Sequence, residues 1–173
     1  MLLDETRHLK RTSTLWTDKE FLADWLVKFN EKDLEAFHCD EIYRVMIIST
    51  GISVGGAKII SFIRRGDEYY VRKKIFSGEA YEQGYAKISG PPLEDSTQIL
   101  RRDDWDEFIQ LLKNNGFWNI SSGHINQCYD CTYHFVEGIN DKKHHIIGTA
   151  MYEKIFQDVR EWLEKKELVK PVR

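Results

Sequence analysis

The residue types best suited to chemistry gather in one short stretch, HINQCYDCTYH, at positions 124–134. Zinc prefers four thiolate or imidazole ligands in a tetrahedron, and a Cys-x2-Cys turn can supply two of them. The candidate ligands in and after this stretch are His124, Cys128, Cys131, His134, His144 and His145. They could hold zinc in a metal-stabilised module or in a small metal-dependent enzyme.

A redox pair and a structural role are the other interpretations of this stretch. Tyr129 and Asp130 stand between the cysteines, where a zinc knuckle usually has Pro or Gly, and a second Cys-x2-Cys is missing from the chain. Redox cysteines gain a low pKa at a helix N-terminus, whereas these lead into a predicted strand. In that strand Cys131 shares a face with Tyr133 and Phe135, as a small core residue would. We therefore predict a structural role and no cofactor, with zinc as the alternative.

A second candidate surface is the predicted hairpin at 58–76, KIISFIRRGDEYYVRKKIF. Aromatic side chains set among cations are typical of surfaces that bind single-stranded nucleic acid. Charged side chains also protect sheet edges from unwanted pairing, and we favour that solvated role. The residues of this hairpin that we expect to contact a partner are Arg64, Arg65, Tyr70, Arg72 and Lys74. An RNA-contacting module is the corresponding alternative.

The length, the net charge and the cysteine count of the chain favour an ordinary soluble domain. A chain of 173 residues fits one domain, and a net charge of -3 is too small to indicate a nucleic-acid or membrane partner. The chain has no apolar run near the roughly 18 residues of a membrane span, and Asp4 interrupts any secretory signal. Three cysteines suggest reduced thiols. We therefore expect a cytoplasmic protein.

Three helices are predicted from apolar residues at helical spacing, at 17–30, 103–116 and 151–166. Thr17 and Glu20 form the capping-box pattern at the start of the first helix, and Gly116 is a natural stop for the second.

Strands are predicted between the helices. The segment EIYRVMIIS, at 41–49, is apolar on both faces and should be central in the sheet. The other predicted strands are 58–65 and 68–76 around the Gly66-Asp67 turn, 97–102, and 132–138 and 143–148 around the turn 139–141. Residues 88–96 are expected to form a loop and residues 1–15 an irregular arm. The pattern predicts a single α+β domain, with a mainly antiparallel sheet of about five to six strands and three main helices.

Residues 41–166 resemble a loose group of small uncharacterised bacterial proteins. In that group a Phe-Trp pair follows a helix, and then come an Asp-Gly, an aromatic-Glu strand and a Tyr-His strand. The matching positions here are Phe117, Trp118, Asp130, Glu137 and His145. Cys131 stands where the group has Gly, Tyr133 or His134 replaces its Trp, and the arginine after the last strand is missing. The resemblance implies an α+β fold and no particular activity.

We predict a protein-binding domain, of an inhibitor or immunity type, rather than an enzyme. The chain has no nucleophile motif and shows no paired acids with a cleft, whereas aromatic residues, 13% of the chain, are favoured as interface anchors. A zinc-binding module or metal-dependent enzyme, and an RNA-contacting module, are the alternatives.

Overall fold

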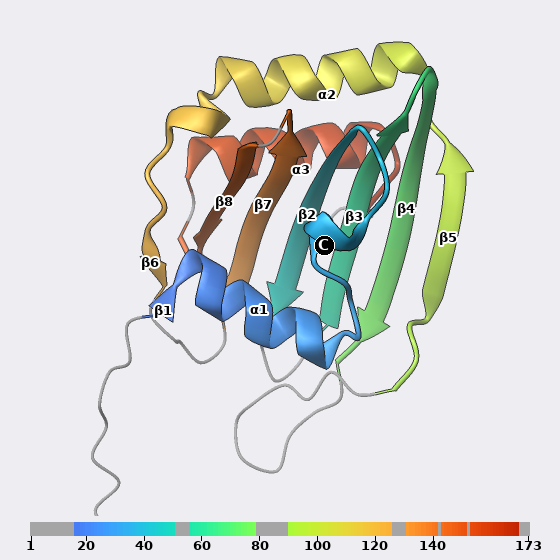
Figure 1. The fold of residues 1–173 in the computed structure, drawn as a ribbon. Coiled ribbons are helices and arrows are strands. Elements are labelled where there is room, and N and C mark those ends of the chain that lie inside the picture. Colours follow the sequence, from blue (N-terminus) through green and yellow to red (C-terminus); the bar gives the residue numbers. More distant parts are fainter. Residues whose placement is uncertain are drawn as a thin grey trace, which may run out of the picture.

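The fold is a six-stranded antiparallel sheet with helices on both faces, as the computed structural model shows for residues 16–50, 56–78, 90–125, 131–141, 143–151 and 153–169 (Figure 1). The strands lie in the order β5-β4-β3-β2-β7-β8. Their bounds are β2 Glu41–Ser49, β3 Gly56–Arg65, β4 Glu68–Ser77, β5 Glu94–Ile99, β7 Thr132–Asn140 and β8 Lys143–Thr149. A separate two-stranded ladder joins β1 Trp16–Thr17 to β6 His124–Ile125. This architecture confirms the predicted α+β domain.

Strand β2 is central because both of its faces are apolar. It pairs with β3 on one side and with β7 on the other, and its first six residues are all buried. A strand covered on both faces is expected to be a nearly continuous apolar run, which is the pattern that predicted its place. The hairpin predicted around the Gly66-Asp67 turn is also confirmed, since Arg65 lies opposite Glu68.

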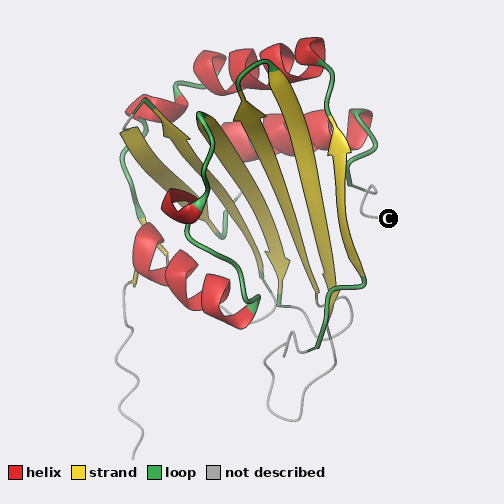
Figure 2. Cartoon of the chain, turned by 45° about the vertical axis from the view of Figure 1, so that its right-hand side comes forward, coloured by secondary structure: helices red, strands yellow, loops and turns green. Residues whose placement is uncertain are grey.

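Two helices, α2 Arg102–Asn114 and α3 Lys154–Lys165, lie on one face of the sheet (Figure 2). Phe108 of α2 is completely buried, and its ring stacks on Phe62 of β3 with centroids 4.2 Å apart. Trp162 of α3 joins them, 5.2 Å from the Phe108 ring. These rings tie both helices to the sheet and form the main apolar core.

Helix α1 Asp18–Lys28 and the short helix η1 Leu34–Ala36 lie on the opposite face. The capping box is confirmed: Thr17 Oγ1 accepts a hydrogen bond from Glu20 N, and Thr17 N donates to Glu20 Oε2. We call residues 30–40, which link α1 to β2 and contain η1, the crossover segment. It covers a small apolar cluster of Leu34, Ile42 and Ile63.

Several predicted boundaries differ from the structure. Residues 94–96, predicted as part of a loop, form the first half of β5, while the predicted strand at 97–102 ends at Ile99 because α2 begins at Arg102. Strand β7 runs through Asn140, so the last turn begins at Asp141 and not at Ile139, where the predicted turn 139–141 starts. Gly116, with φ 67°, follows the end of α2 as predicted. The predicted arm, residues 1–15, lies outside the described residues.

Gly138 is required by a close approach between β7 and the rings beneath it. A Cβ at this position would lie 2.6 Å from Cδ1 of Tyr43 and 3.2 Å from Cε1 of Phe117. Both rings are buried in the core and cannot withdraw. We expect Gly138→Ala to lower the free energy of unfolding by about 1–3 kcal/mol. Urea denaturation measures this, with the exposed Ser77→Ala as control; equal stability of the two variants would contradict the prediction.

Candidate functional site

The candidate zinc ligands are not brought together in the described part of the chain. His134 lies on the face of β7 turned to α3, where its ring is 6.0 Å from Phe156. His144 lies on the opposite face of the sheet, because it pairs with Ile139, an odd number of residues along β7 from His134. His145 contacts Phe117 and Trp118 instead. Two histidines on opposite faces of one sheet cannot bind the same ion.

Cys131 packs against the apolar cluster beneath α1, as its predicted face requires. It is disulfide-bonded, so the expectation of reduced thiols is wrong for this residue. Cys128 and the side chain of His124 lie outside the described residues. Among the residues that are described, no group of three His, Cys, Asp or Glu side chains could hold a metal ion.

His134 is the candidate ligand with the most perturbed acidity. Burial and, to a smaller degree, the charge of Arg160 lower the pKa of His134 to about 4. The imidazole is therefore uncharged at neutral pH. It borders a hollow of about 350 Å³ beside α3, lined also by Met151, Phe156, Gln157, Arg160, Glu161 and Glu164.

The hairpin residues predicted to contact a partner divide between the two faces of the sheet. Arg64 lies on the α2/α3 side and forms an ion pair with Glu41 at 3.3 Å. The other four, Arg65, Tyr70, Arg72 and Lys74, follow the period-two alternation onto the α1 side. Lys74 is only 8% exposed, so these five residues do not form one exposed cationic surface. Strand β4 is also not a sheet edge, because β5 covers it.

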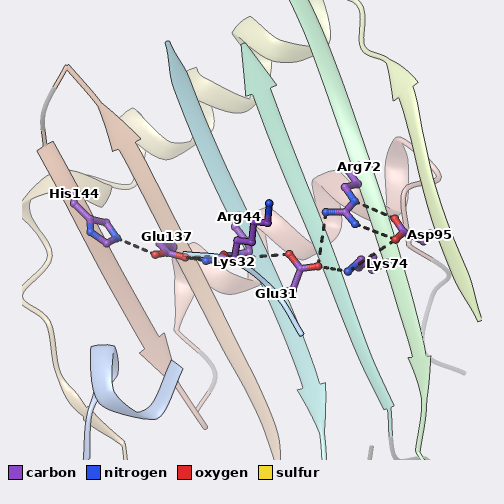
Figure 3. A network of polar contacts seen from close by, with 8 residues as sticks. All are labelled: Glu31, Lys32, Arg44, Arg72, Lys74, Asp95, Glu137 and His144. Atoms are coloured by element: carbon purple, nitrogen blue, oxygen red, sulfur yellow. Dashed lines mark hydrogen bonds and ion pairs between the residues drawn. The ribbon is translucent and has the colours of Figure 1, made fainter. Parts of the chain in front are cut away.

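Arg72 and Lys74 belong instead to an internal row of charges that crosses the sheet on the α1 side (Figure 3). We define the charged row by its eight ionisable side chains: Glu31, Glu35, Arg44, Arg72, Lys74, Asp95, Glu137 and His144. It separates the apolar cluster under α1 from the one under η1, since Arg44 lies between Ile42 and Met46 on the same face of β2.

Arg44 is the centre of the charged row and is 0% exposed. Its Nε and Nη2 both donate to Oε2 of Glu137, at 3.0 and 2.5 Å. Its Nη1 donates to the carbonyl oxygen of Lys32 in the crossover segment, at 2.8 Å, and lies 3.8 Å from Glu31. A buried guanidinium is tolerated only when its donors are satisfied in this way.

The row extends from Arg44 toward both edges of the sheet. On one side Glu31 forms ion pairs with Lys74 and Arg72, and Arg72 makes a two-fold hydrogen bond to Asp95 on β5 at 3.0 and 2.9 Å. On the other side Glu137 Oε1 contacts His144 Nε2 at 2.8 Å. Burial opposes the ionisation of Glu137, but His144 and Arg44 outweigh it and hold its pKa below the ordinary value.

This row was not predicted from the sequence. The alternation of side chains along β7 correctly places His134 and Glu137 on opposite faces of the sheet. It gives no information on His144, which reaches Glu137 from the neighbouring strand β8. Arg44 is the residue from which a buried charged contact could have been inferred. An arginine inside an otherwise apolar central strand requires a buried carboxylate partner.

The two edges of the sheet differ in how they are covered. Beside β8 lies the segment leading to β6, whose Ser122 Oγ donates to the carbonyl oxygen of Ile146 at 3.1 Å (Figure 1). Strand β5 forms the other edge and pairs with β4 alone in the described part of the chain. Ile99 at its end is 83% exposed. The open edge is therefore β5.

No described helix is long and apolar enough to cross a membrane. The resemblance of residues 41–166 to a group of bacterial proteins stays a prediction. No protein-family model and no curated protein matches the chain.

Proposed function

We propose that this chain is a protein-binding domain that takes up an extended segment of another protein along β5. The observation that carries the proposal is that, among the residues the structure describes, β5 is the open edge of the sheet, while β8 is covered. An exposed edge offers a row of backbone donors and acceptors to which a partner strand can add.

The backbone groups available to a partner can be assigned from the ladder. Leu100 N donates to Tyr69 O at 2.8 Å, so the groups of even-numbered residues in this strand point toward β4. The backbone N–H and C=O groups of Asp95, Thr97 and Ile99 consequently point away from β4, toward the open side of the strand. Three outward-facing residues supply enough hydrogen bonds to fix the register of a short partner strand.

The side chains of β5 favour this role. Arg72 and Lys73 from β4 pair with the carboxylates of Asp95 and Glu94, so the acids at the start of the strand are already compensated. The strand contains no Lys and no Pro, the residues that commonly block an edge. A hollow of about 310 Å³ adjoins its far end, lined by Asp67, Glu68, Tyr69, Tyr70, Ile99, Leu100 and Arg102. It could receive an apolar side chain of the partner.

The charged row supports binding over catalysis. A general base needs a free lone pair directed at a substrate, whereas both ring nitrogens of His144 face protein carboxylates. The cations of the alternative RNA module, Arg72 and Lys74, are engaged with Glu31 and Asp95. An inhibitor or immunity-type role fits such a domain, because blocking a partner needs association and no catalytic group.

The proposal is tested by removing a single outward N–H. Peptides of ten random residues, displayed on phage, are selected on the wild-type protein, and their Kd values are then measured for Thr97→Pro and Thr97→Val. Proline lacks the N–H that a partner would accept, and it is tolerated where that N–H faces solvent. We expect binding to weaken about 10-fold or more in Thr97→Pro, as loss of one hydrogen bond of about 1.4 kcal/mol implies.

Thr97→Val is the matched control, because it keeps the N–H and should bind within about 2-fold of wild type, a difference of well under 1 kcal/mol. Thermal unfolding verifies that both variants are folded. Selected peptides that bind Thr97→Pro as tightly as wild type, or a selection that enriches no peptide, would count against the edge as the binding site.

A further inference from the structure

The crossover segment is held on the sheet by hydrogen bonds to its backbone at both ends, by ion pairs of Glu31 and by one buried apolar side chain. Lys32 O accepts from Arg44, and Asp40 N donates to Arg64 O at 3.0 Å. Leu34, only 1% exposed, inserts between them into the small apolar cluster. Glu31 of the segment also forms ion pairs with three cations of the sheet, Arg44, Arg72 and Lys74. Asp40 Oδ2 accepts a hydrogen bond from Gly66 N at 2.5 Å. Glu35, which is otherwise exposed, reaches His144 on β8.

His144 therefore stands between a carboxylate of the sheet and a carboxylate of the crossover segment. Its Nε2 lies 2.8 Å from Oε1 of Glu137, and its Nδ1 lies 3.1 Å from Oε1 of Glu35. An ionised carboxylate only accepts hydrogen bonds, and a neutral imidazole carries one N–H. Both contacts are hydrogen bonds at the same time only when the ring is protonated.

The charge balance of the row leads to the same result. Its carboxylates number four, Glu31, Glu35, Asp95 and Glu137, against three permanent cations, Arg44, Arg72 and Lys74. The row is neutral when His144 is protonated and carries one uncompensated negative charge when it is not. Uncompensated charge in a largely buried site is costly.

We propose that His144 is a proton-operated latch that fastens the crossover segment to the sheet. The protonated ring joins Glu35 of the segment to Glu137 of β7. Loss of the proton removes one of these hydrogen bonds and leaves two carboxylates close to an uncharged ring. Glu35, which is the exposed and weakly held partner, is the one released.

The two carboxylates that contact His144 both favour its protonated form. Glu35 faces it from η1 and Glu137 from β7, with Arg44 of β2 and then Glu31 behind Glu137. The hydrogen bond to Glu137 raises the pKa of His144 above its ordinary value, partial burial opposes the rise, and Glu35 adds to it. The latch is thus fully closed below about pH 6.5, the ordinary value for histidine, and opens as pH rises through the raised pKa.

Cys39 provides a built-in probe, because it lies in the crossover segment and is half-buried against the cluster that the segment covers. Its labelling by methyl methanethiosulfonate is followed by mass spectrometry of the peptide that contains it. Wild type and His144→Gln are compared at the same pH, so that the thiolate fraction of Cys39 cancels in the ratio of rates. We expect the variant to react about 5-fold faster or more at pH 5.5 and within about 2-fold of wild type at pH 9, since 5-fold corresponds to about 1 kcal/mol of lost contact.

Two further variants separate the latch from a general loss of structure. His38→Gln removes an exposed histidine from the same segment and should leave both rates unchanged. Glu35→Ala removes only the segment's side of the contact and should raise the labelling rate as His144→Gln does. It therefore tests the latch even if His144→Gln proves unstable. A rate ratio that is the same at both pH values, or close to one at both, would overturn the latch.

Discussion

Replacing Arg44 with methionine is expected to lower the free energy of unfolding by about 3–5 kcal/mol. Arg44 is fully buried, and it donates to Glu137 and to the carbonyl of Lys32. Methionine fills much of the same volume but leaves Glu137 as a buried carboxylate without the guanidinium that donates two hydrogen bonds to it. Urea denaturation at pH 7 measures the loss, and the slope of the transition should stay unchanged if the denatured state is unaffected.

Two further variants test whether the loss arises from the charge pair. Arg65→Met makes the same substitution at the exposed end of β3 and should change stability by at most about 0.5 kcal/mol. Combining Arg44→Met with Glu137→Leu removes both charges and should be less destabilising than the sum of the two single variants. Strict additivity of the two losses would show that the pair is not coupled.

Replacing Phe108 with alanine is expected to cost about 3–5 kcal/mol as well, for a different reason. The ring is 0% exposed and contacts Phe62 at 4.2 Å, Trp162 at 5.2 Å and Tyr43 at 6.0 Å between centroids. Its removal leaves a cavity among three large rings, which belong to β2, β3 and α3 and cannot all move inward to fill it. The near-ultraviolet circular dichroism and the urea midpoint both report the change.

Ile109→Ala is the control on the same helix, because Ile109 is only partly buried at the margin of this core. It should cost clearly less than Phe108→Ala. Equal losses for the two variants would mean that helix propensity, and not the aromatic packing, determines the contribution of this position.

The fold could be predicted from the sequence wherever packing follows the local pattern of apolar residues. The three helices have apolar side chains at helical spacing, and EIYRVMIIS at Glu41–Ser49 is apolar on both faces. The start of α1 is fixed by a capping box, which involves only Thr17 and Glu20. These interactions are short in range, so the sequence contains all of their determinants.

Strand β5 was partly missed because its residues are poor strand formers when taken alone. Glu94 and Asp95 are more typical of loops. In the structure, they pair with Lys73 and Arg72 across the ladder, and this tertiary contact outweighs the local preference. The start of the strand therefore depended on a neighbour that the sequence pattern did not identify.

The charged row could not be predicted from the sequence because it depends on the strand order. Arg44 and Glu137 are 93 positions apart, and His144 reaches Glu137 diagonally across β7 and β8. Glu31 joins from an irregular segment without a periodic pattern. The sequence shows that Arg44 is buried and that acidic and histidine side chains are available. Only the pairing register of the strands shows which of these side chains come into contact.

The central position of β2 has a consequence for synthesis on the ribosome. Its neighbour β3 follows directly, whereas β7, the neighbour on its other side, emerges about ninety positions later. During that interval we expect β2 to be an outer strand, with apolar side chains exposed and with Arg44 still lacking its partner Glu137. Such edges aggregate, and pairings distant in sequence form slowly. The strand that is covered on both sides in the finished molecule is thus expected to remain an open edge until β7 has been synthesised.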